Sequence, residues 1–121
     1  MTAAAASGFP VAVVGAGLGS APHFRALEDL RAEFPLRWVC ARDAQRLQAA
    51  RLPEGARRTT RLADILEDPE VRAVVVLTPP AAHLEVVRKV AQAGKLWLVE
   101  KPLELDLPRA RELVACCEAA G

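Results

Sequence analysis

The stretch that decides the fold of this chain is VAVVGAGLGS, residues 11–20. Four small or β-branched apolar residues lead directly into a glycine-rich turn, with no alternation of polar and apolar side chains. This pattern is typical of a strand buried on both faces in a parallel sheet. Gly15 and Gly17 fit the first two positions of the dinucleotide-binding glycine pattern, where the backbone turns tightly and then approaches a pyrophosphate. Leu18 and Gly19 complete the turn as further candidate cofactor contacts.

The third position of that pattern is Ser20 instead of glycine, which weakens the match. A helix predicted over residues 18–31 would direct its N-terminal amides and its dipole at the turn, and this favours an anion site. Pro22 lies in the first turn of that helix, where a missing N–H costs little. The alternative interpretation is a tight strand-to-helix turn that binds nothing.

The composition predicts one globular domain. At 121 residues the chain can bury a core without disulfides or metals, and 52% hydrophobic with 26% charged residues is typical of soluble proteins. A net charge of +1 argues against a nucleic-acid partner, and the apolar runs are too short to cross a membrane. Residues 1–8 lack the basic start and apolar core of a signal peptide. We therefore expect a flexible tail over residues 1–8, a domain over residues 9–121 and a cytoplasmic location.

The three cysteines do not form a recognisable ligand set. Cys40 ends an apolar segment, whereas Cys116 and Cys117 are adjacent on a predicted helix and point in different directions. No Cys-x-x-Cys spacing is present, so the sequence argues against a disulfide scaffold and against a metal site. Buried or half-buried thiols are the preferred interpretation.

Strand and helix patterns alternate along the whole chain. Strands are predicted at residues 11–14, 36–40, 56–60, 71–77 and 96–99, and helices at 18–31, 43–51, 62–67, 81–93 and 107–120. Asp43 and Asp106 are the expected N-caps of two of these helices, and Gly94 follows the end of another. Such alternation predicts a Rossmann-type α/β fold, a doubly wound parallel sheet with helices on both faces. The expected strand order is 3-2-1-4-5, with ligands at the carboxyl ends of the first and fourth strands.

The end of the second strand bears on the choice of cofactor. A dinucleotide site normally carries an acid here for the ribose 2′-hydroxyl, but this chain has Ala41 followed by Arg42. An arginine can bind a 2′-phosphate through charge-assisted hydrogen bonds, so the sequence favours NADP over NAD. The alternative is that Arg42 is a solvated surface residue and Asp43 takes the role of the acid.

Two further loops follow strands at the same predicted edge. Thr78, Pro79 and Pro80 end the fourth strand, and His83 is expected one turn into the next helix. Taken alone, this threonine-proline sequence indicates only where the strand ends. The fifth strand ends in Glu100-Lys101-Pro102, where Lys101 could polarise a carbonyl or transfer a proton to an alkoxide. The alternative for that motif is a surface ion pair.

Together these motifs resemble the N-terminal domain of the glucose-fructose oxidoreductase / inositol dehydrogenase (Gfo/Idh/MocA) family, nicotinamide-dependent enzymes acting mainly on sugars and related compounds. The resemblance runs from residue 11 to about residue 113. It rests on Gly15-Ala16-Gly17, His23, Thr78-Pro79 with His83, Gly94-Lys95 and above all Glu100-Lys101-Pro102.

The resemblance implies roles for individual residues. Thr78 and Pro79 would contact the cofactor together with His83, and Lys101 would lie at the nicotinamide and assist proton transfer, held by Glu100. Three departures from the family pattern are Ser20, Pro80 and the pair Ala41-Arg42. The family enzymes also continue into a second, substrate-binding α/β domain, which is absent from this sequence.

The sequence therefore predicts the cofactor-binding domain of an oxidoreductase that favours NADP(H), with NAD as a possible cofactor, and that acts on a sugar-like or related carbonyl or alcohol substrate. We expect no nucleic-acid or membrane partner. A homodimer, or a second domain or chain that completes the site, is expected. The alternatives are a non-catalytic redox-sensing module that binds a dinucleotide and acts through a partner, and a degenerate domain that binds nothing.

Overall fold

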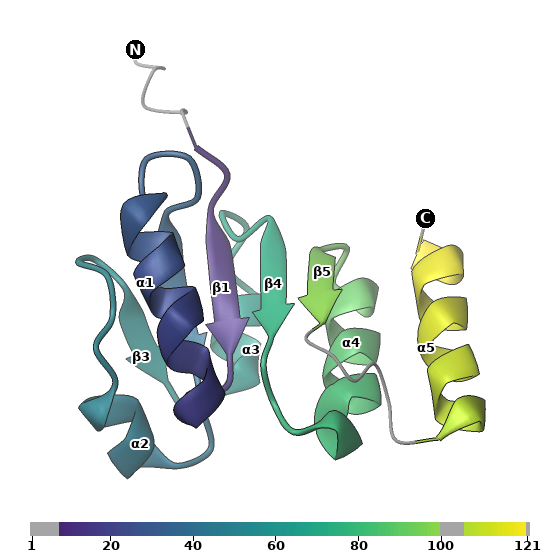
Figure 1. Cartoon of the computed structure of the whole chain (residues 1–121). Coiled ribbons are helices and arrows are strands. Elements are labelled where there is room, and N and C mark those ends of the chain that lie inside the picture. The colour runs from purple at the N-terminus through teal and green to yellow at the C-terminus, as the bar shows by residue number, and fades with distance from the viewer. Residues whose placement is uncertain (1–7, 100–105, 121) are drawn as a thin grey trace.

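A five-stranded parallel sheet forms the centre of the molecule in the computed structural model, which describes residues 8–99 and 106–120 (Figure 1). The strand order is β3-β2-β1-β4-β5, and each neighbouring pair is parallel. The strands are β1 (Val11–Val14), β2 (Leu36–Cys40), β3 (Arg57–Thr59), β4 (Ala73–Val76) and β5 (Leu96–Val99). This confirms the predicted Rossmann-type fold and its strand order.

Helices cover the two faces of the sheet in separate groups. They are α1 (Ala21–Asp29), α2 (Ala44–Ala49), α3 (Leu62–Leu66), α4 (His83–Gln92) and α5 (Leu107–Ala120). Phe24 of α1 and Leu47 of α2 are buried in one apolar cluster, whereas α3, α4 and α5 contribute Ile65, Val87 and Leu113 to the other. Within the described residues, no helix has both the length and the apolarity to span a membrane.

Strand β1 lies between the two clusters and belongs to both. All four of its residues are buried. Val11 and Val13 contribute to the α1–α2 cluster, while Ala12 and Val14 contribute to the α3–α5 cluster. Because side chains alternate across a strand, only an unbroken apolar run can serve a sheet that is covered on both faces.

Several predicted boundaries need correction. The helix predicted over residues 18–31 is α-helical only over Ala21–Asp29, and a 3-10 helix over Leu18–Ser20 precedes it. Likewise, a 3-10 helix over Pro80–Ala82 precedes α4, because the Ala82 N–H bonds to the carbonyl of Pro79 at 2.9 Å. Adjacent prolines supply no N–H groups to an α-helical start.

Helices lie on both faces of the sheet, as predicted, but on one face they do not extend over β5. Leu96 and Leu98, on one face of this strand, are 64% and 63% exposed. Trp97 and Val99, on the other face, pack against the α3–α5 cluster. The helices α1 and α2 therefore leave part of their face of the sheet uncovered (Figure 1).

Asp68 fixes the start of β2 to the loop that precedes β4. Its Oδ2 accepts hydrogen bonds from Arg37 Nε at 2.9 Å and from Trp38 Nε1 at 2.8 Å, and its Oδ1 accepts one from the Glu70 N–H at 2.9 Å. Burial raises the pKa of Asp68, but these hydrogen bonds and the Arg37 charge outweigh burial and hold the pKa below its ordinary value.

We expect Asp68→Asn to lower the free energy of unfolding at neutral pH by about 1–3 kcal/mol, because hydrogen bonds to a charged carboxylate are lost. A carboxyl with a lowered folded-state pKa stabilises fully above its unfolded value of about 3.9, and this stabilisation is lost as the pH falls through the folded pKa. Urea unfolding from pH 7 to pH 3 should therefore show a smaller acid-induced loss in Asp68→Asn than in the wild type. Glu67→Gln, at the neighbouring exposed carboxylate, is the control. Equal acid sensitivity of wild type and Asp68→Asn would contradict the assignment.

Candidate functional site

The carboxyl ends of the parallel strands meet at one edge of the sheet, where the arrowheads in Figure 1 point. Neighbouring strands β1 and β4 continue from this edge in opposite directions, β1 to α1 and on to β2, and β4 to α4 and on to β5. Open α/β sheets bind ligands at such a reversal of strand order. The glycine turn and the Thr78 loop both lie there.

Gly15 brings these two segments into direct contact. Its φ of 117° lies in the left-handed region, and a Cβ at this position would lie 2.8 Å from the carbonyl carbon of Leu77 and 3.1 Å from Thr78 N. Its N–H donates to the carbonyl of Cys40 at 2.7 Å. Only glycine satisfies both the conformation and the close approach.

The rest of the turn leaves its backbone open. A Cβ on Gly19 would meet nothing within 4 Å, and a Cβ on Gly17 would meet only the Arg46 guanidinium. Leu18 begins the 3-10 helix, and Ser20 ends it with 2% of its surface exposed. The Ser20 N–H and hydroxyl both donate to the carbonyl of Gly17. The serine therefore closes the turn internally at the position where the pattern has its third glycine.

Thr78 carries an unused polar atom at this edge. Its Oγ1 is buried and has no hydrogen-bond partner in the part of the chain that the structure describes. Buried hydroxyls are almost always hydrogen-bonded, so the Thr78 hydroxyl is a candidate for a hydrogen bond to a molecule bound next to the glycine turn. Pro79, the next residue, is exposed.

His83 contacts the same loop. It is the first residue of α4, not one turn into the helix as predicted, and only 1% of its surface is exposed. Its Nε2 lies 2.8 Å from the carbonyl oxygen of Thr78. Because a carbonyl only accepts, Nε2 carries the proton in this contact. The buried ring therefore holds the Thr78 carbonyl in place through this hydrogen bond.

The end of β2 lacks the acidic residue that usually binds the ribose of a dinucleotide, and the contacts of the residues there agree with this difference. The Ala41 N–H donates to the carbonyl of Thr59 at 3.1 Å, and the Arg42 side chain is exposed. Asp43 accepts hydrogen bonds from Gln45 N at 2.9 Å and Arg46 N at 3.2 Å. Its carboxylate is therefore engaged as the N-cap of α2, as the sequence predicts.

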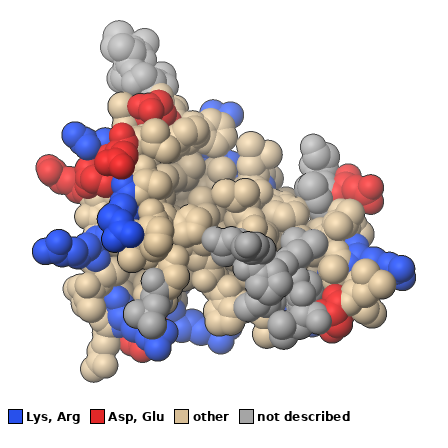
Figure 2. Space-filling model, viewed as in Figure 1, with Lys and Arg blue, Asp and Glu red and all other residues tan. Residues whose placement is uncertain are grey.

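Arg46 is a residue of this site that the sequence interpretation missed. Its Nη1 lies 3.9 Å from the position that a Cβ on Gly17 would occupy. The available signal was its spacing, since Arg46 follows Arg42 by four residues, across the start of α2. In Figure 2, Lys and Arg side chains gather at the lower left, where α1 begins and α2 lies.

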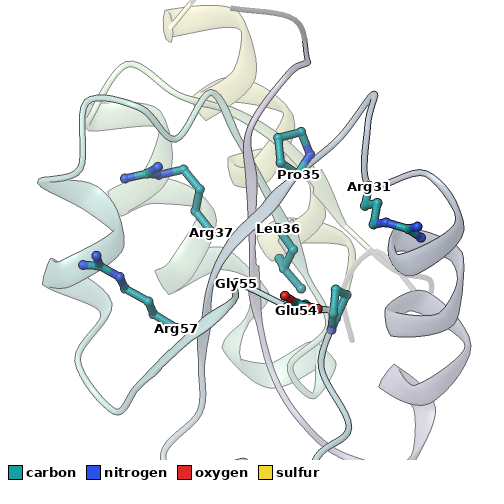
Figure 3. A pocket seen from close by; sticks show the side chains of 8 residues that line it. Arg31, Pro35, Leu36, Arg37, Glu54, Gly55 and Arg57 are labelled. Atoms are coloured by element: carbon teal, nitrogen blue, oxygen red, sulfur yellow. The ribbon is translucent and has the colours of Figure 1, made fainter. Parts of the chain in front are cut away.

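A cavity of about 360 Å³ opens at the opposite edge of the sheet, between the starts of β2 and β3 (Figure 3). Three arginines contribute to its wall, and each guanidinium already has a partner. Arg31 pairs with Glu28 at 3.0 Å, Arg37 pairs with Asp68 at 2.9 Å, and Arg57 lies 5.6 Å from the centre of the Trp38 ring. In Figure 3 the three groups point to the sides of the cavity instead of converging. This cavity is separate from the predicted site.

The end of β2 also holds a buried cysteine. Cys40 is 6% exposed. Burial raises the pKa of its thiol, and the nearby Asp64 carboxylate raises it further. This confirms the expectation of a buried thiol at Cys40. The described residues contain no group of His, Cys, Asp or Glu side chains arranged to hold a metal ion.

Lys101, the predicted catalytic residue, and Glu100, which was expected to hold it, lie outside the described residues.

Comparison with known proteins also identifies this chain as a Rossmann fold. The family model described as "Oxidoreductase family, NAD-binding Rossmann fold", that of Gfo/Idh/MocA, matches residues 9–121. The chain belongs to this family. The resemblance proposed from the motifs is therefore confirmed.

Similar proteins include dehydrogenases and a 3-ketoreductase. D-apiose dehydrogenase of Paraburkholderia graminis is 36% identical over 115 residues, covering 93% of this chain and 30% of the relative. The WlbA dehydrogenase from Bordetella pertussis, solved with NADH and UDP-GlcNAcA, has a TM-score of 0.87 and 30% identity, covering 95% of this chain and 34% of that one. KijD10 from Actinomadura kijaniata, a 3-ketoreductase solved with NADP, has a TM-score of 0.82 and 27% identity, covering 94% of this chain and 36% of that one. The chain thus spans about a third of the length of these relatives.

We expect Gly15→Ala to lower the free energy of unfolding by more than the strain of an alanine at positive φ would cost alone. Left-handed backbone costs an alanine about 1–2 kcal/mol, and displacing the Leu77 carbonyl costs a further ~1–3 kcal/mol. Gly55→Ala is the matched control, because Gly55 also has a positive φ, of 92°, but a Cβ there would meet nothing within 4 Å. Urea unfolding of both variants separates conformational strain from crowding. Equal losses would contradict the close approach of β1 and β4.

Proposed function

We propose that residues 9–121 form the cofactor-binding domain of an NAD(P)-dependent oxidoreductase that acts on a sugar-like or related carbonyl or alcohol substrate. One observation carries this proposal. The Gly15 turn touches the Thr78 loop at the reversal of strand order, and the hydroxyl of Thr78 is buried there without a partner in the described structure. Membership of the Gfo/Idh/MocA family supports the same conclusion.

The residues at this edge fit a dinucleotide. Gly15 would make the tight turn, and the open backbone of Gly17 and Gly19 would hold the pyrophosphate, together with the N–H groups of the 3-10 helix that begins at Leu18. Thr78 and Pro79 would contact the cofactor across the reversal. His83 would act indirectly, by holding the carbonyl of Thr78. When bound, the cofactor supplies hydride transfer at its nicotinamide ring, while the protein binds and orients it.

The same edge favours NADP(H), with NAD as the less preferred cofactor. Asp43 Oδ1 accepts hydrogen bonds from two N-terminal amides of α2, so this acid serves as the helix cap, which disfavours its use as the acceptor for a ribose 2′-hydroxyl. Arg42 is exposed at the end of β2 and can donate two parallel hydrogen bonds to a 2′-phosphate. Related structures contain either NADH or NADP, so this preference depends on residues of the chain itself.

We expect the purified chain to bind NADPH more tightly than NADH. Arg42→Ala should weaken NADPH binding by about tenfold or more, since hydrogen bonds to a charged group contribute about 1.5–3 kcal/mol. NADH binding should not change and serves as the internal control. Energy transfer from Trp38 and Trp97 to the nicotinamide measures both affinities. A folded chain that binds neither dinucleotide would overturn the proposed function, whereas tighter binding of NADH would overturn only the preference.

We expect Thr78→Val to separate folding from binding. Because the Thr78 hydroxyl has no partner in the described structure, its removal should leave the free energy of unfolding unchanged or slightly higher. Dinucleotide binding should weaken by about two- to tenfold. Thr59→Val is the control, because the Thr59 hydroxyl bonds to Asp64 and to the Arg61 N–H, so this variant should lose stability. Unchanged affinity in Thr78→Val would exclude a direct contact of this hydroxyl with the cofactor.

We also propose Lys101 as the proton-transfer residue, with Glu100 beside it. The family resemblance supports this assignment, since Glu-Lys-Pro follows the fifth strand in the chain. A lysine ammonium can protonate a developing alkoxide or polarise a carbonyl when its surroundings lower its pKa.

We propose that catalytic turnover requires a second domain or a second chain. The curated relatives and solved structures are about three times as long as this chain. The exposed apolar residues Leu96 and Leu98 on β5 support a covering partner, which a homodimer could also provide. D-apiose dehydrogenase, and WlbA with UDP-GlcNAcA, support a sugar-like substrate.

A further inference from the structure

The loop that carries Thr78 is held through its carbonyl groups. Residues 79–80 are both proline and have no N–H, so this part of the loop cannot donate backbone hydrogen bonds. The carbonyl of Thr78 lies 2.8 Å from His83 Nε2, and the carbonyl of Ala81 accepts a hydrogen bond from Arg109 Nη2 at 3.2 Å. Two side chains from different helices therefore hold the loop, one on each side of the prolines.

Arg109 belongs to the first turn of α5, which begins at the same edge of the sheet as α4 (Figure 1). Its N–H donates to Asp106 Oδ1 at 2.9 Å, so a cap fixes the backbone at this point. Leu113 follows four residues later on the same face of the helix, and it is fully buried in the α3–α5 cluster. The half-buried Arg109 therefore reaches the loop from an anchored face of α5.

The stability of α5 does not explain an arginine in its first turn. The start of a helix carries a partial positive charge, so a cation there opposes the helix dipole. Two other interactions already join α4 and α5. Arg88 Nη2 lies 2.8 Å from Glu112 Oε2, and Leu113 is buried in the same apolar cluster as Val87. The hydrogen bond to Ala81 therefore contributes more to the loop than to the helix.

We propose that Arg109 is a positioning residue, which holds the loop so that the Thr78 hydroxyl keeps its place toward a bound dinucleotide. This inference rests on the proposed function. Because Thr78 Oγ1 has no hydrogen-bond partner within the described residues, its position depends on the contacts of the loop backbone. A polar group that is already in place loses less conformational freedom when a ligand binds, and this increases affinity. Arg109 acts through Ala81 and does not touch the cofactor.

A direct contact of the Arg109 guanidinium with a cofactor phosphate is the competing assignment. A guanidinium has five N–H donors, so the bond to Ala81 does not use all of them. The two assignments differ in how the effects of Arg109 and Thr78 combine. A positioning effect operates through the Thr78 hydroxyl and disappears when this hydroxyl is removed, whereas a direct contact adds to it independently.

The test is a double-mutant cycle in the full 121-residue chain, measured by calorimetric titration with NADPH and with NADH. Arg109→Ala should weaken the binding of both by about two- to fivefold, because a positioning hydrogen bond of ordinary strength is lost. The variant that combines Arg109→Ala with Thr78→Val should bind no more weakly than Thr78→Val alone. Arg109→Lys, which keeps a donor for the Ala81 carbonyl, should restore most of the affinity.

Arg88→Ala is the matched control. It removes the ion pair with Glu112 between the same two helices and leaves the printed hydrogen bonds of the loop in place. Urea unfolding should show a similar small loss of stability in Arg88→Ala and Arg109→Ala, but Arg88→Ala should bind both dinucleotides as the wild type does. Circular dichroism checks that each variant folds.

Each other result overturns the inference. Losses that add in the double variant would assign Arg109 to a direct contact with the cofactor. Unchanged affinity in Arg109→Ala, or an equal loss in Arg88→Ala, would leave Arg109 with a purely structural role. Unchanged affinity in Thr78→Val would remove the hydroxyl through which Arg109 acts.

These results leave the proposed function standing, because the wild-type chain still binds a dinucleotide. If the folded wild-type chain binds neither NADPH nor NADH, the proposed function and this inference fail together.

Discussion

The close approach of β1 and β4 at their carboxyl ends is the constraint on which the candidate site depends. Gly15 packs against the Leu77 carbonyl so tightly that no Cβ fits, and the Leu77 N–H donates to the carbonyl of Val14 at 2.8 Å. The Gly15 N–H reaches the carbonyl of Cys40 on the other side. One residue without a side chain thus connects the ends of β1, β2 and β4. The glycine turn and the Thr78 loop meet because of this connection.

The two edges of the sheet use their polar groups differently. At the amino edge, Asp68 receives hydrogen bonds from Arg37, Trp38 and Glu70, and the Lys95 ammonium bonds to two backbone carbonyls. These groups satisfy one another and stabilise the fold. At the carboxyl edge, the Gly17 and Gly19 backbone is open. The polar groups of the amino edge therefore have a structural role, whereas the carboxyl edge leaves glycine backbone accessible to a ligand.

The hydrogen bonds of three residues that the motifs single out give them structural roles. His83 matches a family motif, yet it is buried and bonds to the carbonyl of Thr78. Asp43 stands next to the expected acid position, yet its carboxylate caps α2. Ser20 departs from the glycine pattern, yet it bonds within the turn. In each case the side chain organises the backbone around the site, so mutations there are expected to act through the geometry of the site.

The sequence by itself determined the fold, the strand order and the position of the glycine turn, because an unbroken apolar run and regular strand–helix alternation allow few other arrangements. It placed Asp43 and Asp106 as N-caps, since capping is a local interaction. Only the tertiary structure decided that Arg46 approaches Gly17, that Leu96 faces outward on β5, and that 3-10 helices precede α1 and α4. These features depend on which segments meet across the sheet and at what distance. Local periodicity records which faces are apolar, but it does not record those distances.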